Sequence, residues 1–457
     1  MSALWTSAEI ETATGGVVSG PFAATGVAFD SREVGPGDLF IALKGETTDG
    51  HRFVDGAFEQ GAAGAIVSRP VAHPHVQVAD TTAALDALGV AARARTAAKI
   101  AGVTGSVGKT GTKEALSAAL ARGKRGAVHR SVKSYNNHTG VPLSLSRMAA
   151  GSAFGVFEMG MNHAGELAAL TRLVRPHVAL ITTIAAAHIE FFDSIEAIAD
   201  AKGEIFQGLE PGGTAIIPFD SPHRDRLFGH ARPYAANILT FGIGDGADVR
   251  ALEAIPNGNG TMVTVRLPEA ELSFTLSQPG AHWVSNALAV LAAVDALGGD
   301  LAAAGLALAD FEGLAGRGAH HRIRVGDGNA LLIDESYNAN PTSMAATLEV
   351  LGTTEAARRI AVLGAMRELG PASDALHAGL AEPVLAAGVD YALLVGSGME
   401  PLAEALEGKV ECAHWPDASS AGEALQKLIR PGDAILIKGS NAIGLGRIVT
   451  TLTGRQN

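Results

Sequence analysis

The feature that most constrains the fold of this chain is the segment Gly102-Val-Thr-Gly-Ser-Val-Gly108-Lys109-Thr110. It follows a short apolar run and precedes a helical pattern over Thr112–Ala121. In such a loop the glycines let backbone N–H groups surround phosphate oxygens, Lys109 reaches the terminal phosphates, and Thr110 can bind magnesium. The strict motif has a glycine five residues before Gly108, where this chain has Val103. An ordinary glycine-rich turn is the alternative, but Gly-Lys-Thr at a strand–helix junction favours a variant phosphate-binding loop.

Short Val, Ile, Leu and Phe runs alternate with Ala-rich stretches along the chain, which predicts an α/β fold with mostly parallel sheets covered by helices. At about 150 residues per domain, 457 residues suggest three domains, which we place at 1–98, 99–316 and 317–457. The expected strands are Val27–Asp30, Asp38–Leu43, Ala65–Ser68, Ile100–Val103, Phe154–Glu158, Val178–Thr183, Thr214–Pro218, Ala330–Asp334, Ile360–Gly364, Tyr391–Val395 and Ala434–Lys438. The expected helices are Thr82–Ala98, Thr112–Ala121, His282–Leu297, Thr342–Leu351, Ala372–Ala387 and a last one at the carboxyl end.

The regular strand–helix alternation after residue 317 predicts a doubly wound domain. The glycine-rich stretch Gly313–Gly318 precedes it and is a candidate hinge, with a flexible surface loop as the alternative.

Charge and composition exclude several classes of function. Lys plus Arg number 35 and Asp plus Glu number 47, so the net charge of 35 − 47 = −12 argues against a general nucleic-acid binder. The single cysteine, Cys412, excludes a disulfide framework and a cysteine-rich metal site. Glu9 and Glu11 stand where a signal peptide would need an apolar run, and no apolar run is long enough to span a membrane. We therefore expect a cytoplasmic protein with no nucleic-acid partner and no membrane span.

Residues beyond the loop could complete a site. Glu158 ends an apolar strand, and the carboxyl ends of parallel strands face the ligand crevice, so it is a candidate magnesium ligand, with an ion-paired or capping glutamate as the alternative. His188 follows a second such strand, where a core or loop histidine fits as well as a ligand. Lys202, in a helical stretch, is by its pattern alone a solvated lysine. His282 and Asn286 share one helix face, and a capping histidine with a buried asparagine is the simpler interpretation.

The order of several motifs resembles that of the Mur ligase family. These motifs are Gly105-Ser-Val-Gly108-Lys109-Thr110, Asn136-Asn137-His-Thr-Gly140-Val-Pro142, Glu158-Met-Gly-Met-Asn162-His163, His188, Ala201-Lys202-Gly203-Glu204-Ile-Phe, His282 to Asn286, Gly316-Arg317 and Asp334-Glu335-Ser336-Tyr337-Asn338-Ala339-Asn340-Pro341. An amino-terminal block from Asp30-Ser31-Arg32 to Asp49-Gly50-His51 resembles the uridine-nucleotide domain of one branch of that family. The matches span almost the whole chain.

The resemblance implies a small mixed α/β UDP-binding head, a central P-loop ATPase with a mostly parallel sheet, and a C-terminal Rossmann-like domain. It implies ATP-dependent ligation of D-alanyl-D-alanine to UDP-N-acetylmuramoyl-tripeptide through an acyl phosphate, which yields a peptidoglycan precursor, ADP and phosphate. The implied cofactor is Mg²⁺, with two ions expected, and the expected oligomeric state is a monomer. Closure of the third domain would shield the acyl phosphate from water.

The resemblance also assigns roles to individual residues. It implies catalytic roles for Lys109, Lys202 and His188, and a carbamylated Lys202 that acts as an anionic magnesium ligand. The implied metal ligands are Thr110, Glu158, His188 and the Lys202 carbamate. The implied ATP-binding residues are Gly105, Ser106, Val107, Gly108, Lys109, Thr110, Gly111, Asn286, Arg317 and Asp334. The implied UDP-substrate residues are Ser31, Arg32, Lys44, Asp49 and His51.

The chain departs from the family pattern at four places. Gly111 stands where a second Thr or Ser is usual, and Ala185-Ala186 replaces a common Gly-Pro. Ala365 stands where aspartate is frequent, and Asn441 where arginine is frequent. The last two departures leave open how the third domain holds the incoming dipeptide.

Other functions fit parts of the pattern. A sister ligase that adds a single amino acid and a folylpolyglutamate synthetase are the alternatives within the enzyme class. The block Asp334 to Pro341, and the absence of an Asp-Asn-Pro-Arg-type motif, argue against both. A P-loop switch that uses nucleotide only as a signal is the non-enzyme alternative, and a metal-binding series at Glu158, His188 and Lys202 would argue against it.

Overall fold

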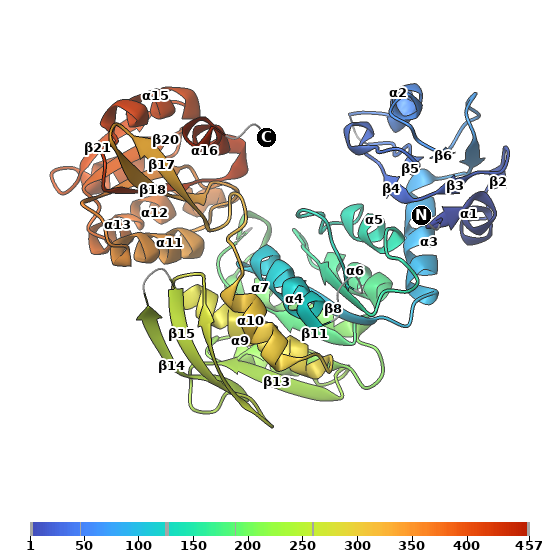
Figure 1. The fold of residues 1–457 in the computed structure, drawn as a ribbon, viewed down its shortest axis with the longest axis horizontal. Helices are drawn as coiled ribbons and strands as arrows, with labels where there is room; N and C mark the ends of the chain where they lie inside the picture. Colours follow the sequence, from blue (N-terminus) through green and yellow to red (C-terminus); the bar gives the residue numbers. More distant parts are fainter. Residues whose placement is uncertain (1–2, 46, 124–127, 188, 258–259, 455–457) are drawn as a thin grey trace.

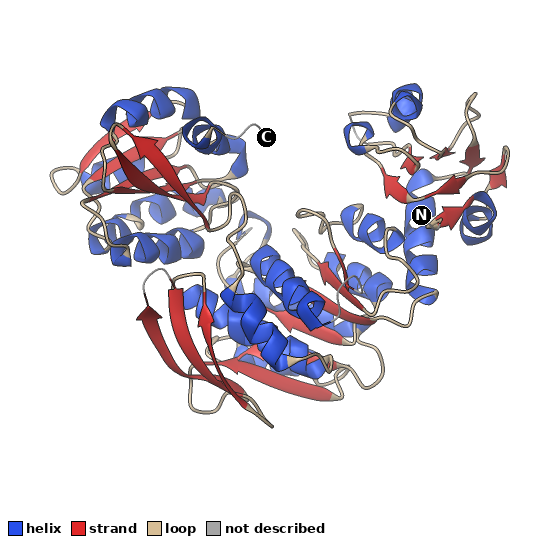
Figure 2. Ribbon diagram, in the orientation of Figure 1, coloured by secondary structure: helices blue, strands red, loops and turns tan. Residues whose placement is uncertain are grey.

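The computed structural model describes residues 3–45, 47–123, 128–187, 189–257 and 260–454. The chain forms three lobes in sequence order, with the amino-terminal and carboxyl-terminal lobes standing apart on either side of the central one (Figure 1). Four sheets lie within the described ranges, and helices cover the two largest on both faces (Figure 2). The α/β class and the three-lobe architecture expected from the sequence are therefore confirmed, while the boundaries at residues 98 and 316 stay predictions.

The amino-terminal lobe is a small sheet with one long helix beneath it. Its strands are β1 (Trp5–Thr6), β2 (Val17–Val18), β3 (Ala23–Ala24), β4 (Gly26–Ala28), β5 (Asp38–Ile41), β6 (Gly64–Val67) and β7 (His75–Gln77), and its helices are α1 (Ser7–Thr14), α2 (Val54–Glu59) and α3 (Thr81–Ala94), with short 3-10 turns η1 (Ser31–Glu33) and η2 (Gly50–Phe53). The main sheet has the order β2-β7-β6-β5-β4, in which β4 to β7 are parallel. Because β4 and β5 are parallel neighbours, the loops that follow them lie at the same edge of the sheet.

The central lobe is built on a sheet that contains nine strands in the described part of the chain. Its strands are β8 (Lys99–Thr104), β9 (Val128–Arg130), β10 (Phe154–Glu158), β11 (Val178–Ile181), β12 (Thr214–Pro218), β13 (Asn237–Gly242), β14 (Val249–Asn257), β15 (Gly260–Arg266) and β16 (Glu271–Leu276). Its helices are α4 (Lys109–Gly123), α5 (Gly140–Ser146), α6 (Glu166–Val174), α7 (Ile195–Gly203), α8 (Arg224–Ala231), α9 (Ala281–Ala296) and α10 (Leu301–Ala309), with 3-10 turns η3 (Ile189–Phe191) and η4 (Glu204–Gly208). The order β16-β15-β14-β13-β12-β11-β8-β10-β9 places β8 between β11 and β10, all parallel.

Two apolar clusters pack on the two faces of this central sheet. One joins the sheet to α4, α9 and α10, and the other joins it to α5, α6, α7 and α8. Alternate residues of β8 face opposite clusters, with Val103 in the first and Ile100 in the second. With both faces buried, the carboxyl edge of β8, β10 and β11 is where this sheet can present polar side chains to a ligand.

The carboxyl-terminal lobe is a sheet with five parallel strands and one antiparallel edge strand. Its strands are β17 (Ala319–Val325), β18 (Gly328–Glu335), β19 (Arg358–Gly364), β20 (Tyr391–Val395), β21 (Glu411–Trp415) and β22 (Asp433–Lys438), in the order β17-β18-β22-β19-β20-β21. Its helices are α11 (Pro341–Thr353), α12 (Ser373–Ala378), α13 (Ala381–Ala386), α14 (Glu400–Leu406), α15 (Ala418–Leu428) and α16 (Gly446–Thr453), with 3-10 turns η5 (Gly370–Ala372) and η6 (Asn441–Ile443). Apolar clusters lie on both faces, as the doubly wound prediction requires.

Some predicted elements differ from the structure. The single helix expected over Ala372–Ala387 is wrong, because the segment forms α12 and α13. Pro383 lacks an N–H, and its ring would clash with the carbonyl of Gly379 in a continuous helix. The helix after the phosphate loop begins at Lys109 rather than Thr112, and the helix expected over Thr82–Ala98 ends at Ala94. The antiparallel extension β14–β16 was not predicted.

Candidate active site

The phosphate loop joins β8 to α4 through glycines whose conformations only glycine adopts readily. Gly105 has a φ of 150° and Gly108 a φ of 86°. A Cβ at Gly105 would overlap the Thr182 hydroxyl, and one at Gly108 would lie 2.8 Å from the Asn286 amide oxygen. Val103, the departure from the strict motif, is still inside β8 and fully buried, so the loop turns only after it.

Packing explains the glycine at position 111, which is another departure from the family pattern. A Cβ at this position would lie 3.1 Å from Cη2 of Trp283, a buried residue of α9. Because α9 also carries Asn286 against Gly108, the glycines at 108 and 111 let α9 approach the loop and the first turn of α4. The contact places the predicted nucleotide residue Asn286 beside the predicted phosphate loop.

Glu158 and Thr110 form the oxygen-rich part of the site. Glu158 ends β10 and is 1% exposed. Its Oε2 accepts a hydrogen bond from the Thr110 hydroxyl at 2.9 Å, and its Oε1 accepts one from the Asn136 amide at 2.8 Å. Both of these partners are neutral, so the buried carboxylate has no ion pair of its own among the described residues. A hydroxyl and an unpaired carboxylate are donors that suit Mg²⁺.

Lys109 interacts electrostatically with charged residues from two domains. Its Nζ donates to the Gly105 carbonyl at 2.7 Å. Burial lowers the pKa of Lys109, the negative charge of Glu158 opposes this, and the positive charge of Arg317 adds to it. Arg317 comes from the segment that enters the third domain, so the charge of Lys109 interacts with groups from both domains. A triphosphate would provide the anion that this half-buried ammonium lacks.

Lys202 is not the solvated lysine that its helical pattern suggests. It lies on α7, is 1% exposed, and has no hydrogen bond or ion pair to any described residue. Burial, with the positive charge of Lys109 as a smaller cause, holds the pKa of Lys202 well below its usual value. A neutral amine is therefore favoured at this position, close enough to Lys109 for the two charges to interact.

Two of the predicted nucleotide residues lie at the entry to the third domain. Arg317 donates to the Ser134 hydroxyl at 3.1 Å, and its guanidinium carbon lies 4.2 Å from the centre of the Tyr337 ring. Asp334, only 3% exposed, accepts from the Gly316 amide at 2.6 Å and from the Ser336 hydroxyl at 2.6 Å. In this structure Asp334 thus holds the candidate hinge segment, and its contact with nucleotide stays a prediction.

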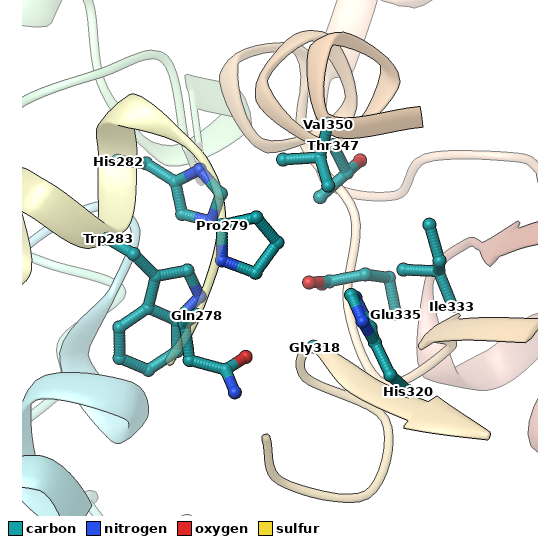
Figure 3. Close-up of a pocket in the computed structure, with 10 residues that line it drawn as sticks. All are labelled: Gln278, Pro279, His282, Trp283, Gly318, His320, Ile333, Glu335, Thr347 and Val350. Carbon is teal, nitrogen blue, oxygen red and sulfur yellow. The ribbon is translucent and has the colours of Figure 1, made fainter. Parts of the chain in front are cut away.

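The central and third domains meet at a narrow pocket. Pro279, His282 and Trp283 approach from the α9 side, and His320, Glu335 and Thr347 from the third domain (Figure 3). Burial, with the charge of Lys438 adding to it, lowers the pKa of His282 to about 4, so this histidine is neutral near pH 7. The pocket lies beside the helix that carries Asn286.

The predicted UDP-substrate residues gather at one edge of the amino-terminal sheet. Ser31 and Arg32 follow β4, and Lys44, Asp49 and His51 follow β5. Arg32 is exposed and paired with Asp30, and Lys44 is also exposed.

His51 differs from the other four, because its side chain is 3% exposed. It is hydrogen bonded to Asp49 at 2.7 Å and accepts from the Ser68 amide at 2.8 Å. In this structure the hydrogen bonds of His51 hold the loop that follows β5 in place. Substrate contacts of all five residues stay predictions.

His188, the remaining predicted metal ligand, lies outside the described residues. Within the described ranges no cluster of three or more His, Cys, Asp or Glu side chains could hold a metal ion. A site built from Glu158 and Thr110 therefore needs a further anion, and a modified Lys202 would provide one.

Sequence reasoning missed Lys113, a fully buried lysine on α4. Its ammonium donates to the carbonyls of Ser131 and Lys133 at 2.9 and 2.7 Å and pairs with Glu114 at 2.8 Å. The segment it holds continues to Asn136, the partner of Glu158. The only sequence signal is that Lys113 follows Lys109 by four residues, which places both on one helix face.

Three family models match this chain. One described as "Mur ligase middle domain" matches residues 103–294, one described as "Mur ligase, glutamate ligase domain" matches residues 321–441, and one described as "Mur ligase family, catalytic domain" matches residues 23–123.

Curated relatives and solved structures match over nearly the full length. The UDP-N-acetylmuramoyl-tripeptide–D-alanyl-D-alanine ligase of Escherichia coli (strain K12) is 36% identical over 438 residues, which cover 93% of each chain. A crystal structure of MurF from Acinetobacter baumannii is 32% identical with a TM-score of 0.85, covering 99% of both chains. A structure of MurF ligase from Thermotoga maritima in complex with ADP is 28% identical with a TM-score of 0.77, covering 94% of this chain and 97% of that one.

Proposed function

The chain belongs to the Mur ligase family, and from that premise we propose that it joins D-alanyl-D-alanine to UDP-N-acetylmuramoyl-tripeptide at the expense of ATP. The products are the pentapeptide precursor of peptidoglycan, ADP and phosphate. The observation that carries this proposal is the meeting of Lys109, Glu158 and Lys202 at one edge of the central sheet, beside the phosphate loop.

The reaction begins with the approach of two anions. The terminal carboxylate of the tripeptide attacks the γ-phosphorus of ATP, giving an acyl phosphate and ADP. The Lys109 ammonium and the amides of the phosphate loop offset the repulsion and stabilise charge on the transferring oxygens. The amine of the dipeptide then attacks the acyl carbon, and phosphate leaves as the amide bond forms.

Magnesium fits the oxygen donors of the site. Thr110 and Glu158 would hold it, and Asn136 orients the Glu158 carboxylate. When bound, the ion neutralises phosphate charge during transfer. The proposal includes a second Mg²⁺ ion, and it includes His188 as a further metal ligand.

Lys202 is proposed to act as a carbamate. Its depressed pKa favours the neutral amine, whose nitrogen can attack the carbon of CO₂, form an N–C bond and release a proton. The carbamate converts this neutral amine into an anion near Lys109, which attracts the Lys109 ammonium and supplies further oxygen donors.

The test of the reaction measures phosphate release with ATP, UDP-N-acetylmuramoyl-tripeptide and a panel of amines. Release is expected with D-alanyl-D-alanine and not with single amino acids, and Lys109→Ala is expected to abolish it. Preference for a single amino acid would indicate a sister ligase instead. Nucleotide binding with no turnover on any amine would indicate a switch.

The carbamate is tested in the same assay with Lys202→Ala. We expect a loss of at least about 100-fold, partly restored by added acetate or formate. Lys99→Ala is the control, because the Lys99 ammonium donates, among the described residues, to the Leu297 carbonyl alone and lies outside the site. Full activity of Lys202→Ala without added carboxylate would remove Lys202 from the site.

The structure bears on one of the remaining sequence-based expectations, that of no membrane span. Among the described residues no helix is long and apolar enough to cross a bilayer. The monomeric state, the cytoplasmic location and the uridine-nucleotide contacts of Ser31, Arg32, Lys44, Asp49 and His51 stay predictions.

A further inference from the structure

Lys113, on α4, is a charged side chain with no exposed surface, and the proposed reaction gives it no role. Its ammonium has three N–H donors. Two of them bind the carbonyls of Ser131 and Lys133, at 2.9 and 2.7 Å, and the third binds the Glu114 carboxylate at 2.8 Å. Because all three donors are used, Lys113 has none left for a nucleotide. Any effect of this lysine on the reaction has to pass through the residues that it holds.

Two of these bonds reach one segment, residues 131–136, which contacts the end of β10 at three points. The Ser131 hydroxyl accepts from the Glu158 amide at 3.2 Å, and the Asn136 side-chain amide donates to the Glu158 carboxylate at 2.8 Å. The Asn136 carbonyl accepts from the Gly160 amide at 2.7 Å. A Cβ at Gly160 would lie 2.8 Å from the Asn136 side-chain oxygen, so the segment packs directly on the backbone that follows β10. Both the backbone and the carboxylate of Glu158 therefore form hydrogen bonds with this one segment.

The backbone of the segment has an unfavourable conformation at one residue. Lys133 has a φ of 54°, in the left-handed region that residues with a side chain rarely adopt. Such a conformation persists where the surrounding structure enforces it. The Lys113 ammonium binds the carbonyl of this same residue, so the buried cation stabilises the turn at the point where it is strained.

Contacts with the amino-terminal domain hold the same segment in a different way. Lys133 forms an ion pair with Glu33, but the Lys133 side chain is 61% exposed, and exposed ion pairs contribute little. The Tyr135 hydroxyl also donates to Glu33, at 2.8 Å. Both contacts are made by side chains of the segment, whereas Lys113 binds its backbone from the buried side. The loss of a buried hydrogen-bond donor is costly, so the position of the backbone depends strongly on Lys113.

We propose that Lys113 is a positioning residue for the magnesium site. This rests on the proposed function, in which Glu158 holds the ion. By fixing the backbone of residues 131–136, the Lys113 ammonium keeps Asn136 bound to Oε1 of Glu158, and Oε2 is thereby directed toward Thr110 and the phosphate loop. Removal of a group that orients a metal ligand typically weakens metal binding or activity by about 10- to 100-fold.

The test measures ATP binding rather than turnover. Dissociation constants for ATP are determined by isothermal titration calorimetry without the UDP substrate, once with Mg²⁺ and once with EDTA, for wild type and Lys113→Met. Methionine keeps an unbranched side chain and removes the ammonium. We expect the Kd for ATP to rise by about 10-fold with Mg²⁺ and to stay unchanged with EDTA, because Lys109 and the loop glycines still bind the phosphates. A change of equal size in both conditions, or no change in either, would overturn the proposal.

A double-mutant cycle tests the route through Asn136. Asn136→Ala should raise the Kd measured with Mg²⁺. The double variant should be little worse than Lys113→Met alone, because both changes act through the same contact with Glu158. Losses that multiply would show that Lys113 and Asn136 act independently, contrary to the proposal.

Lys99→Met is the matched control, because the Lys99 ammonium also donates to a backbone carbonyl, that of Leu297, but lies outside the site. It should leave both Kd values unchanged. If Lys113→Met does not fold, Lys113→Gln keeps N–H donors at the buried position and should show a smaller rise confined to Mg²⁺; the absence of any rise would count against the proposal. ATP binding by wild type that does not depend on Mg²⁺ would overturn the magnesium site of the proposed function instead, which separates the two ideas.

Discussion

The central domain meets its two neighbours in different ways. At the junction with the amino-terminal domain, the Trp5 indole donates to the Ser146 carbonyl at 2.8 Å, and Arg147 donates to the Val27 carbonyl at 2.6 Å. The Glu33 carboxylate accepts from the Tyr135 hydroxyl at 2.8 Å, and Leu143 of α5 belongs to the apolar cluster of the amino-terminal domain. This junction is a continuous core with buried hydrogen bonds.

The junction with the third domain has fewer direct contacts. Arg317 donates to Ser134 at 3.1 Å, and the Glu190 amide donates to the Glu368 carbonyl at 3.3 Å. The connecting segment contains Gly316 and Gly318, both at positive φ. From this contrast we expect the first two domains to move as one body and the third to swing toward the site, where it would exclude water from the acyl phosphate.

The largest expected effect is at the first junction. Trp5→Ala should lower the free energy of unfolding by roughly 3–5 kcal/mol, because it removes a buried aromatic side chain from the shared core. Urea denaturation measures the loss, and Trp5→Phe separates packing from the indole hydrogen bond. A loss below about 1 kcal/mol would mean that the two domains are not one packed body.

At the second junction we expect a kinetic effect. Gly316→Ala adds a Cβ that would lie 2.8 Å from the Tyr337 Cβ at a φ of 74°, whereas Gly326→Ala, at a φ of 56°, meets no atom within 4 Å. The left-handed backbone conformation should cost each variant about 1–2 kcal/mol of stability, and Gly316→Ala should lose more because of its close contact with Tyr337. Only Gly316→Ala should lower kcat, by on the order of 10-fold, because it restricts the hinge. Equal kcat values for the two variants would remove Gly316 from domain closure.

The smallest effect is a pH dependence at the first junction. Burial alone would raise the pKa of Glu33, but hydrogen bonds from Lys133 and Tyr135 outweigh it and lower the pKa below 4.5. Because the folded-state pKa is depressed, Glu33 stabilises the fold above the unfolded pKa, and this contribution is lost as the pH falls through the folded value. The stability difference between wild type and Glu33→Gln should therefore shrink as the pH falls below 4.5, which denaturation at several pH values would show.

Much of the fold follows from local patterns. The strands Phe154–Glu158, Thr214–Pro218 and Tyr391–Val395 have the predicted bounds, because short apolar runs between turn residues specify buried parallel strands. The prediction of a single helix over 372–387 was wrong, because Pro383 interrupts a pattern that otherwise favours one helix.

The site was only partly predictable. The phosphate loop and Glu158 could be placed from the sequence, because a loop motif and a strand end fix where they lie. The pairing of Asn136 with Glu158 and the support from Lys113 could not, because both depend on a segment folding back across the sheet.

The sequence by itself determined where the phosphate loop lies, that the sheets are mostly parallel, and which family motifs the chain carries, because these depend on residues close together in the chain. Only the tertiary structure decided that Lys202 is buried beside Lys109, and that one domain junction is packed and the other sparse. The physical reason is that the burial and the charge environment of a residue depend on residues distant in the sequence. A local helix or loop pattern does not identify those residues.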